Sequence, residues 1–398
     1  TAKIQTNQIK IGKNVTISNN VVIISDKLII EDNVKIGANS VIKGNSIKIK
    51  KDSVILSTGS NKQYDLPFLW LRDNCQCDEC RITETQEKQF LLHTVPVDIS
   101  PKSVEIKDES LFIVWPDNHQ SVIPLNKIEE SGKPRYPEHK LWTSKFTPRR
   151  FDWSEFLDNK EIAFEALKTF VSFGVIILNN APKEPNTLEL LSKRFGPIHE
   201  TLFERIHNVS VTGNVYNVAH TSRGLPPHND FPSYKSQPSV QALHMLENEC
   251  EGGELIIVDG WEIVEDLRKD NPEYFNILKE FNVPFRQFDE NNETYAEAPI
   301  IKCSSDGSLE SFRFSNQLMQ MIDPTVKDIK RFYKAYHEVS AKVHDSKYRS
   351  TFRLNGGELL VVASLRVLHG REPFIPSGKR HLQDAYFVYD NALNNTII

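Results

Sequence analysis

Isoleucines at nearly regular spacing mark the first 60 residues. They recur every six positions and then slip by one, at Ile11, Ile17, Ile23, Ile29, Ile36 and Ile42, with Asn, Asp and Gly in the gaps. Hexapeptide periodicity is typical of a short parallel β-helix, whose stacked coils cover one another's apolar edges. Alternating Val and Ile would also suit an antiparallel strand meander, so both interpretations stay open. In either case residues 1–60 are expected to have a structural or assembly role.

From residue 141 onward helical and strand patterns alternate. Helical spacing covers residues 161–172 and 187–194, and a charge-rich helix is predicted from Asp323, as N-cap, to about His344. Apolar runs bounded by turn residues predict strands at residues 174–179, 252–259, 358–368 and 385–389. Many short strands with flanking helices indicate a mainly β domain. For residues 141–398 we therefore predict a double-stranded β-helix, or jelly roll.

Composition narrows the class of protein. A chain of 398 residues is long enough for two or three domains, and its charged and apolar fractions are ordinary for a globular protein. The net charge of −5 and the lack of a basic stripe argue against a nucleic-acid partner. No apolar run approaches the ~18 residues of a membrane span, and the start lacks a signal-peptide pattern. Five cysteines, three of them crowded together, suit a reducing compartment. We expect a cytoplasmic protein without a membrane partner.

Residues 61–140 carry a set of metal-ligand type. Cys75, Cys77 and Cys80 cannot all pair, and a disulfide across one intervening residue would be strained. With the distant His119 they form a Cys₃His set, which predicts a closed structural site for Zn(II). His93 is a competing fourth ligand, and free buried thiols are the remaining alternative.

Four residues in the second half of the chain form another set with metal-ligand and anion-binding side chains. His228 and Asp230 lie two positions apart on extended backbone, so both can bind one metal, and His369 in Leu-His-Gly-Arg offers a third ligand. Two histidines and one carboxylate on one face of iron leave open positions for a co-substrate and dioxygen. Arg380 lies eleven residues beyond His369 and can grip a dicarboxylate. A lone His-x-Asp is a weak signal, but this set with its strand context indicates an Fe(II)/2-oxoglutarate oxygenase.

With these motifs in view, residues 61–398 resemble the γ-butyrobetaine and trimethyllysine hydroxylase family within the taurine-dioxygenase-like superfamily. The shared motifs begin with Trp-Leu-Arg-Asp-Asn-Cys-x-Cys-x-x-Cys and end with Arg-His-Leu-x-x-Ala-Tyr. The resemblance implies a zinc-bearing N-terminal domain, usually involved in dimerisation, and hence a homodimer or higher homo-oligomer. It also implies iron at His228, Asp230 and His369, with 2-oxoglutarate held by Arg380.

The resemblance further implies where the substrate binds. The positions of the family's aromatic cage for a trimethylammonium group read Phe203, His207, His220 and Tyr386, and Asn217 matches a residue that binds the substrate carboxylate. Only Tyr386 is unchanged among the cage positions, and the replacements are poorer partners for a cation. The nearby run carries Arg313, Ser315 and Asn316, in which Arg313 could bind an anion or be a solvated strand residue. The pocket is therefore expected to differ from that of the family.

Together these observations predict an Fe(II)- and 2-oxoglutarate-dependent dioxygenase. It would hydroxylate an unactivated C–H of a small polar zwitterion, such as an amino acid or betaine-like acid, with O₂ and with succinate and CO₂ as co-products. One alternative keeps the cofactors but gives desaturation or cyclisation in secondary metabolism. The other is a non-catalytic, metal-stabilised scaffold.

Overall fold

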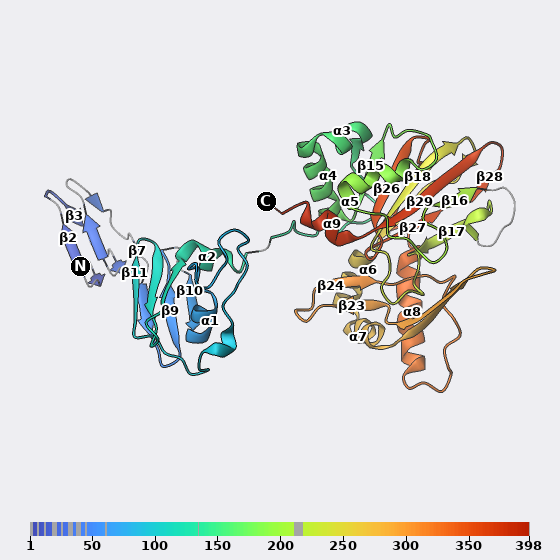
Figure 1. Cartoon of the computed structure of the whole chain (residues 1–398). Coiled ribbons are helices and arrows are strands. Elements are labelled where there is room, and N and C mark those ends of the chain that lie inside the picture. The colour runs from blue at the N-terminus through green and yellow to red at the C-terminus, as the bar shows by residue number, and fades with distance from the viewer. Residues whose placement is uncertain are drawn as a thin grey trace. The chain divides into compact units, whose positions relative to one another are not determined.

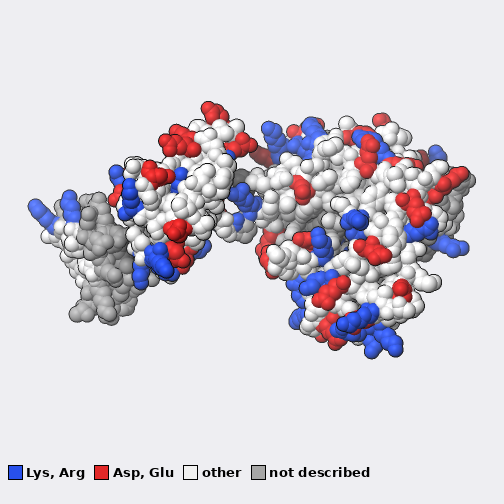
Figure 2. Space-filling model, turned by 60° about the horizontal axis from the view of Figure 1, so that its bottom comes forward, with Lys and Arg blue, Asp and Glu red and all other residues white. Residues whose placement is uncertain are grey.

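The computed structural model falls into two compact units, Thr1–Pro134 and Arg135–Ile398 (Figure 1). It describes the chain except residues 1–2, 6–7, 12, 18–21, 25–26, 31–34, 37–40, 44–45, 60–61, 134, 211–217 and 398. Within the described ranges no helix combines the length and apolarity needed to cross a bilayer. On the face drawn in Figure 2, Lys and Arg are interspersed with Asp and Glu over the coloured residues.

Short parallel strands build the start of the first unit. The pairs form three sets: β1 (Lys3–Gln5), β4 (Val22–Ile24) and β7 (Val41–Lys43); β2 (Gln8–Ile11) and β5 (Lys27–Ile30); β3 (Thr16–Ile17) and β6 (Lys35–Ile36). Lys3 pairs with Val22 and Val22 with Val41, so one coil takes 19 residues. Three hexapeptides plus one residue give this length, which accounts for the one-residue slip in the isoleucine pattern. Parallel pairing confirms the β-helix interpretation, and the antiparallel meander is wrong for these strands.

Two antiparallel sheets complete the first unit. One contains β8 (Ser46–Ile49), β9 (Ser53–Ser57) and β10 (Gln63–Pro67), the other β11 (Ser103–Lys107), β12 (Ser110–Val114) and β13 (Gln120–Pro124), with helices α1 (Phe68–Asp73), η1 (Leu92–Thr94) and α2 (Leu125–Glu130). Leu56, Leu71, Leu111 and Trp115 are fully buried in their shared core. The domain boundary expected between residues 60 and 61 falls inside the antiparallel β9–β10 hairpin. Because β8 also pairs with β9 in antiparallel fashion, the parallel segment ends before β8.

The second unit contains two sheets. The larger has the order β14 (Arg150–Asp152), β15 (Val175–Asn179), β26 (Glu358–Ala363), β18 (Val240–Asn248), β29 (Arg380–Phe387) and β16 (His207–Ser210). The smaller has the order β17 (Leu225–His228), β27 (Val367–Arg371), β20 (Leu255–Asp259) and β25 (Arg349–Phe352). The cores follow from alternation along the strands, because successive side chains point to opposite faces. Val175, Ile177, Leu255 and Ile257 share one core between the two sheets, as a jelly roll requires.

Helices cover the outer faces of both sheets (Figure 1). Ile176 and Leu178 of the larger sheet pack with α3 (Trp153–Asp158), α4 (Lys160–Phe173) and α9 (Tyr389–Asn394). Ile256 and Val258 of the smaller sheet pack with α6 (Gly260–Asp270), α7 (Pro272–Glu280) and α8 (Ile329–His344). The remaining elements are η2 (Thr187–Leu191), α5 (Ser192–Phe195), η3 (Val218–His220), β19 (Glu251–Gly252), β21 (Val283–Phe288), β22 (Glu293–Ala298), β23 (Ile301–Cys303), β24 (Leu309–Phe312) and β28 (Phe374–Ile375).

Two local predictions differ from the structure. The charge-rich helix begins at Ile329 with Asp328 as its N-cap, whereas Asp323 caps a turn by accepting a hydrogen bond from the backbone N–H of Thr325 at 2.8 Å. The apolar run 358–368 is not one strand: it breaks after Ala363 and resumes at Val367 in the other sheet.

A buried ion pair fixes that break. Arg366, in the turn between β26 and β27, donates from Nε and Nη2 to the two carboxylate oxygens of Asp259 at 3.0 and 2.7 Å. The side chains are 3% and 0% exposed. Asp259 also accepts from the backbone N–H groups of Trp142 and Trp261. The pair therefore locks the end of β20 to the turn that leads into β27.

Candidate active site and metal centres

Three ligand-type side chains meet at one end of the smaller sheet. His228, which ends β17, pairs directly with His369 of β27, and their ring centroids are 4.4 Å apart. Asp230 follows two residues later, with Oδ1 3.2 Å from His228 Nε2 and Oδ2 3.9 Å from His369 Nε2. Their ligand atoms all lie within 4.8 Å of one another. Two imidazoles and one carboxylate in this arrangement fit a single Fe(II) and leave one side of it open.

Local contacts set the chemistry of the histidines. His228 Nδ1 lies 2.9 Å from the carbonyl oxygen of Pro226, which can only accept, so Nδ1 carries the proton and Nε2 is free to bind a metal. Burial, followed by the nearby charge of His228, lowers the pKa of His369 to about 4. Burial opposes the charge of Asp230, but hydrogen bonding to His228 and the two imidazoles hold its pKa well below the ordinary value. Burial opposes the charged form of His228, but its hydrogen bond to Asp230 and the charge of that carboxylate raise the pKa of His228. A metal ion bound at Nε2 would take the place of the proton between the imidazole and the carboxylate.

The residues around Asp230 hold its backbone. Asn229 is 1% exposed and exchanges hydrogen bonds with the backbone of Phe314, while its Nδ2 donates to the carbonyl of Ser364 at 2.6 Å. Phe231 adopts φ of 52°, a left-handed conformation that is rare for a bulky residue. Such backbone persists only where its surroundings enforce it. The sharp turn directs Asp230 back toward the two histidines.

A cavity of about 90 Å³ adjoins the triad and contains Arg380. Arg380 is 7% exposed, its Nε has no hydrogen-bond partner, and its guanidinium lies 5.1 Å from the Phe374 ring. Burial is the main cause that lowers its pKa to about 10, so it stays charged at neutral pH. A buried cation without an anionic partner is costly, and a carboxylate in this cavity would supply one. Because 2-oxoglutarate is a dicarboxylate, the cavity fits it.

Arg371 lines the same cavity but is already engaged. Its Nη atoms donate to the carbonyl oxygens of Ala219, Thr221 and Arg223 at 2.7 to 3.1 Å. Arg371 therefore holds the loop before β17 and keeps only Nε without a partner, whereas no side-chain hydrogen bond engages Arg380 among the described residues.

A larger cavity of about 350 Å³ opens on the other side of His228 and Asp230. Of the sequence-predicted substrate residues, Phe203 and Ser315 line it. The β21–β22 hairpin contributes Arg286, Gln287, Phe288 and Asp289. The remaining lining residues are Ala219, Leu225, Gln317, Leu318 and Gln320. The cavity combines apolar, uncharged polar and charged groups next to the candidate iron ligands, as a small-molecule site requires.

Four expected substrate residues lie elsewhere. His207 and Tyr386 contact one another edge to face, at 5.6 Å between ring centroids, beside Asp230. His220 is buried with Nδ1 3.3 Å from the carbonyl oxygen of Ser210. Asn316 is exposed and accepts from Tyr336 at 3.4 Å. Asn217 lies outside the described residues. The structure therefore brings only part of the expected cage to the larger cavity.

The contacts of Arg313 differ from both interpretations that the sequence offered, an anion-binding residue and a solvated strand residue. Arg313 is 6% exposed, which excludes a solvated strand arginine, and it lines neither cavity. Its Nη atoms donate to the carbonyl oxygens of Pro232, Tyr234 and Lys235. Three of its five N–H donors are used in this way. These contacts favour a structural role in holding the loop after Asp230.

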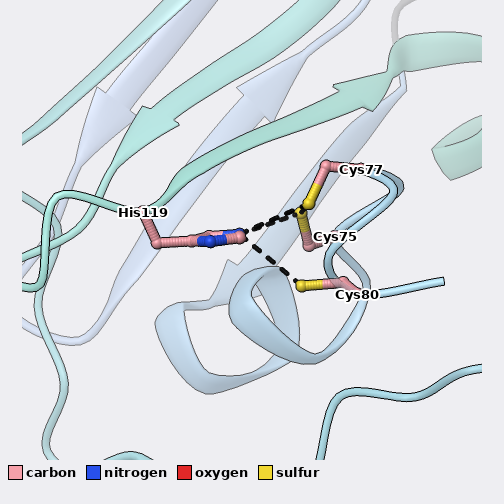
Figure 3. Close-up of side chains that lie close together, drawn as sticks. All are labelled: Cys75, Cys77, Cys80 and His119. Carbon is pink, nitrogen blue, oxygen red and sulfur yellow. Dashed lines mark hydrogen bonds between the residues drawn. The ribbon is translucent and has the colours of Figure 1, made fainter.

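The first unit contains a second ligand cluster, drawn in Figure 3. His119 Nε2 lies 3.4, 3.6 and 3.5 Å from the sulfur atoms of Cys75, Cys77 and Cys80. Tetrahedral zinc with ordinary Zn–S and Zn–N bonds would separate sulfur and nitrogen by about 3.5 Å. The rival His93 is exposed and outside the cluster. The four residues therefore fit a structural zinc ion.

Neighbouring side chains complete that cluster. Arg72 is 5% exposed and donates from Nη1 to Cys80 Sγ at 3.3 Å, and Glu79 Oε2 lies 3.2 Å from His119 Nδ1. Burial opposes ionisation of Cys75, but hydrogen bonds led by that of Ser121 lower its pKa to about 7. A carboxylate behind the histidine fixes the ring, and a cation beside the sulfurs balances their charge.

Sequence patterns missed Gln241 and Asp384, two buried polar residues beside the triad. Both lie on strands of the larger sheet and line the smaller cavity. No motif marks them, and neither stands out from its strand, because β18 also carries His244 and β29 also carries His381 and Gln383.

Comparisons with known proteins agree with this geometry. Residues 138–386 match the taurine catabolism dioxygenase TauD, TfdA family; residues 46–123 match the N-terminal γ-butyrobetaine hydroxylase-like family; residues 27–56 match the hexapeptide repeat of succinyl-transferase. The γ-butyrobetaine dioxygenase of Pseudomonas sp. (strain AK-1) is 31% identical over 346 residues, which cover 83% of this chain and 90% of that protein.

Two further relatives are more distant. Mitochondrial trimethyllysine dioxygenase of Rattus norvegicus is 26% identical over 348 residues, 83% of this chain and 82% of that protein. The crystal structure of a taurine dioxygenase from Burkholderia xenovorans covers 64% of this chain and 91% of that one, with 13% identity and a TM-score of 0.47. The TauD match spans more than half of the chain, and the enzyme interpretation therefore stands over the scaffold. The chain belongs to the TauD, TfdA family and is an Fe(II)- and 2-oxoglutarate-dependent dioxygenase.

Proposed function

We propose that His228, Asp230 and His369 hold the iron and that Arg380 binds the distal carboxylate of 2-oxoglutarate. The larger cavity then takes a small polar zwitterion, an amino acid or betaine-like acid, and presents one of its C–H bonds for hydroxylation. When bound, Fe(II) and 2-oxoglutarate supply the oxidising chemistry, with succinate and CO₂ as co-products. The observation that carries the proposal is a buried, unpartnered Arg380 in the cavity beside the triad.

The protein's own residues position and shield the reactants. His228 presents Nε2 because its Nδ1–H donates to the carbonyl oxygen of Pro226, and β17–β27 pairing fixes the distance to His369. Leu243, Leu255 and Leu382 line the smaller cavity and keep water from the dicarboxylate. Excluding water strengthens the ion pair to Arg380 and protects reactive species from side reactions.

The lining of the larger cavity supports the substrate class. Only Phe203 among the four expected cage positions lines it, so a trimethylammonium group would lack an aromatic enclosure. Ser315, Gln317 and Gln320 instead offer hydrogen-bonding groups. This supports a substrate that is recognised largely through hydrogen bonds, as an amino acid with a primary ammonium would be.

A succinate-release screen tests the proposal. Protein loaded with Fe(II) and 2-oxoglutarate is offered amino acids, betaines, sulfonates and phosphonates, with Asp230→Ala as the matched inactive variant. The proposal predicts substrate-dependent succinate from a zwitterion and a product that has gained one oxygen atom. A product that has instead lost two hydrogens would indicate desaturation or cyclisation. No succinate with any compound would count against the substrate class.

The first unit is proposed to be structural. Its Cys₃His cluster would hold zinc, and the parallel coils formed by β1 to β7 would support assembly of the chain into a homodimer or larger homo-oligomer. Light scattering after size exclusion, on the full chain and on a chain lacking the coils, measures this. If the full chain and the shortened chain form particles with the same number of copies, the assembly role is wrong.

A further inference from the structure

The two oxygens of Asp230 have different surroundings. Oδ1 faces His228 Nε2 at 3.2 Å, whereas Oδ2 lies farther from a histidine, at 3.9 Å from His369 Nε2. Oδ2 accepts two hydrogen bonds, from Gln241 Nε2 at 2.6 Å and from the Tyr386 hydroxyl at 2.7 Å. A carboxylate held through one oxygen leaves the other free to bind a metal, and its orientation depends on what holds the first.

Gln241 lies between two acids. Its amide nitrogen donates to Asp230 Oδ2 and also to Asp384 Oδ2, at 3.1 Å. Because both acceptors are carboxylates, only the NH₂ end of the amide can face them. Gln241 Oε1 is then left buried without a partner. An unsatisfied buried acceptor costs about 1–3 kcal/mol, so stability alone would not select this orientation.

Strand pairing fixes Asp384. It pairs with His207 across β16 and β29, is 5% exposed, and lies four residues beyond Arg380 on the same face of β29. His207 Nδ1 is 3.9 Å from Asp384 Oδ1, too far for a hydrogen bond. The hydrogen-bond partners of Asp384 are therefore the Gln241 amide and the Tyr386 hydroxyl, and the proposed grip on 2-oxoglutarate does not use Asp384.

We propose that Asp384 is a positioning residue, which acts through Gln241 to fix which oxygen of Asp230 faces the metal. The inference rests on the proposed function, because it needs Asp230 as an iron ligand. Asp384 holds one hydrogen of the amide, so that the other points at Asp230 Oδ2. Tyr386 supplies the second bond to the same oxygen and is thereby a positioning residue rather than part of a substrate cage.

The geometry has a defined consequence for metal binding. A carboxylate free to rotate could bind through both oxygens and occupy a position needed by the co-substrate. With Oδ2 held by two donors, Asp230 binds through Oδ1 alone, and the three protein ligands stay on one side of the ion. Outer partners of metal ligands commonly contribute 10- to 100-fold in metal affinity.

Titration with Mn(II) alone, on zinc-replete full-length protein without 2-oxoglutarate, tests the inference. Asp384→Leu and Gln241→Met replace the polar groups by apolar ones of similar size. Because each leaves a buried partner unpaired, thermal unfolding is measured beside the titration to show that the variants are folded. Each is expected to weaken Mn(II) binding about 10- to 100-fold. Asp384→Asn is expected to retain most of the affinity, because its amide oxygen can still accept from Gln241.

Gln383→Leu is the matched control. Gln383 is equally buried and adjacent to Asp384, but it bonds to Asn186 and Asn208. The Gln383→Leu variant should have a lower melting temperature than wild type and an unchanged affinity for Mn(II). Wild-type affinity in Asp384→Leu, or equal losses in Asp384→Leu and Asp384→Asn, would overturn the inference. If wild-type protein bound no more Mn(II) than His228→Ala, the proposed function would fail and the inference with it.

Discussion

His228 and His369 lie directly opposite one another on β17 and β27, with ring centroids 4.4 Å apart. They are far apart in sequence, and an antiparallel strand pair sets their separation. The fold therefore places the two histidines that we propose as metal ligands, and only Asp230, on the turn after β17, depends on local contacts. A preorganised site of this kind is expected to bind its metal without rearranging the sheet.

Replacing Arg380 by alanine should raise the KM for 2-oxoglutarate strongly. Removing one partner of a buried charged pair costs about 2–5 kcal/mol, which corresponds to roughly 30- to 5,000-fold. Steady-state succinate release against 2-oxoglutarate concentration measures this. The exposed neighbour Lys379, whose side chain is 73% exposed and lies 3.5 Å from Glu247, provides the control, and Lys379→Ala should behave as wild type. An unchanged KM in Arg380→Ala would refute the assignment.

Replacing Cys77 by serine should release the zinc and destabilise the first unit. Structural zinc contributes folding free energy directly, so its loss acts on stability and not on the chemical step. Metal analysis and thermal unfolding of the variant measure both effects. His93→Ala removes the rival histidine and should retain a full equivalent of zinc. Zinc lost from His93→Ala but kept in His119→Ala would reverse the assignment of the fourth ligand.

Replacing Asp259 by alanine should destabilise the second unit by about 3–5 kcal/mol, because Arg366 would be left as a buried, uncompensated charge. Urea unfolding measures the loss. The exposed pair Lys302–Glu310, at 2.8 Å, is the comparison, and Glu310→Ala should cost less than about 1 kcal/mol. Similar costs for the two variants would mean that the Asp259 pair contributes little to the turn between β26 and β27.

Stability should fall as the pH drops from about 6.5 to 4 because of His244. This residue is fully buried on β18, neither ring nitrogen has a partner, and burial lowers its pKa to about 4. Between these values the unfolded chain binds a proton that the folded protein does not, so acid favours unfolding. The loss is roughly 3 kcal/mol at most, and it is absent at neutral pH.

Urea unfolding at a series of pH values measures that loss in wild type and in His244→Leu. The variant should show a shallower decline with acid, whereas His337→Leu, which changes an exposed histidine, should follow wild type. Parallel curves for wild type and His244→Leu would show that the acid sensitivity lies elsewhere.

The sequence was informative where chemistry needs residue types at short spacing. The spacing of His228 and Asp230 predicted a metal site, and the cysteine spacing predicted the Cys₃His cluster. The sequence was less informative where tertiary packing decides where a helix or strand begins. Asp323 has the residue type and the following proline of an N-cap, yet α8 starts at Ile329, where its apolar residues begin to pack against the smaller sheet.

The role of an arginine could not be read from its type alone. Arg313 and Arg380 both carry a planar fork suited to an anion. Loop carbonyls engage Arg313, whereas the donors of Arg380 face a cavity. Likewise Gln241 and Asp384 gain their significance from strands that pair only in the folded chain.

Anomalous diffraction from crystals soaked with Mn(II) and 2-oxoglutarate tests the central claim most directly. The predicted result is a manganese peak within bonding distance of His228 Nε2, Asp230 Oδ1 and His369 Nε2, with the distal carboxylate of 2-oxoglutarate against the Arg380 guanidinium. A manganese peak away from these three side chains, or a 2-oxoglutarate carboxylate bound elsewhere than at Arg380, would contradict it.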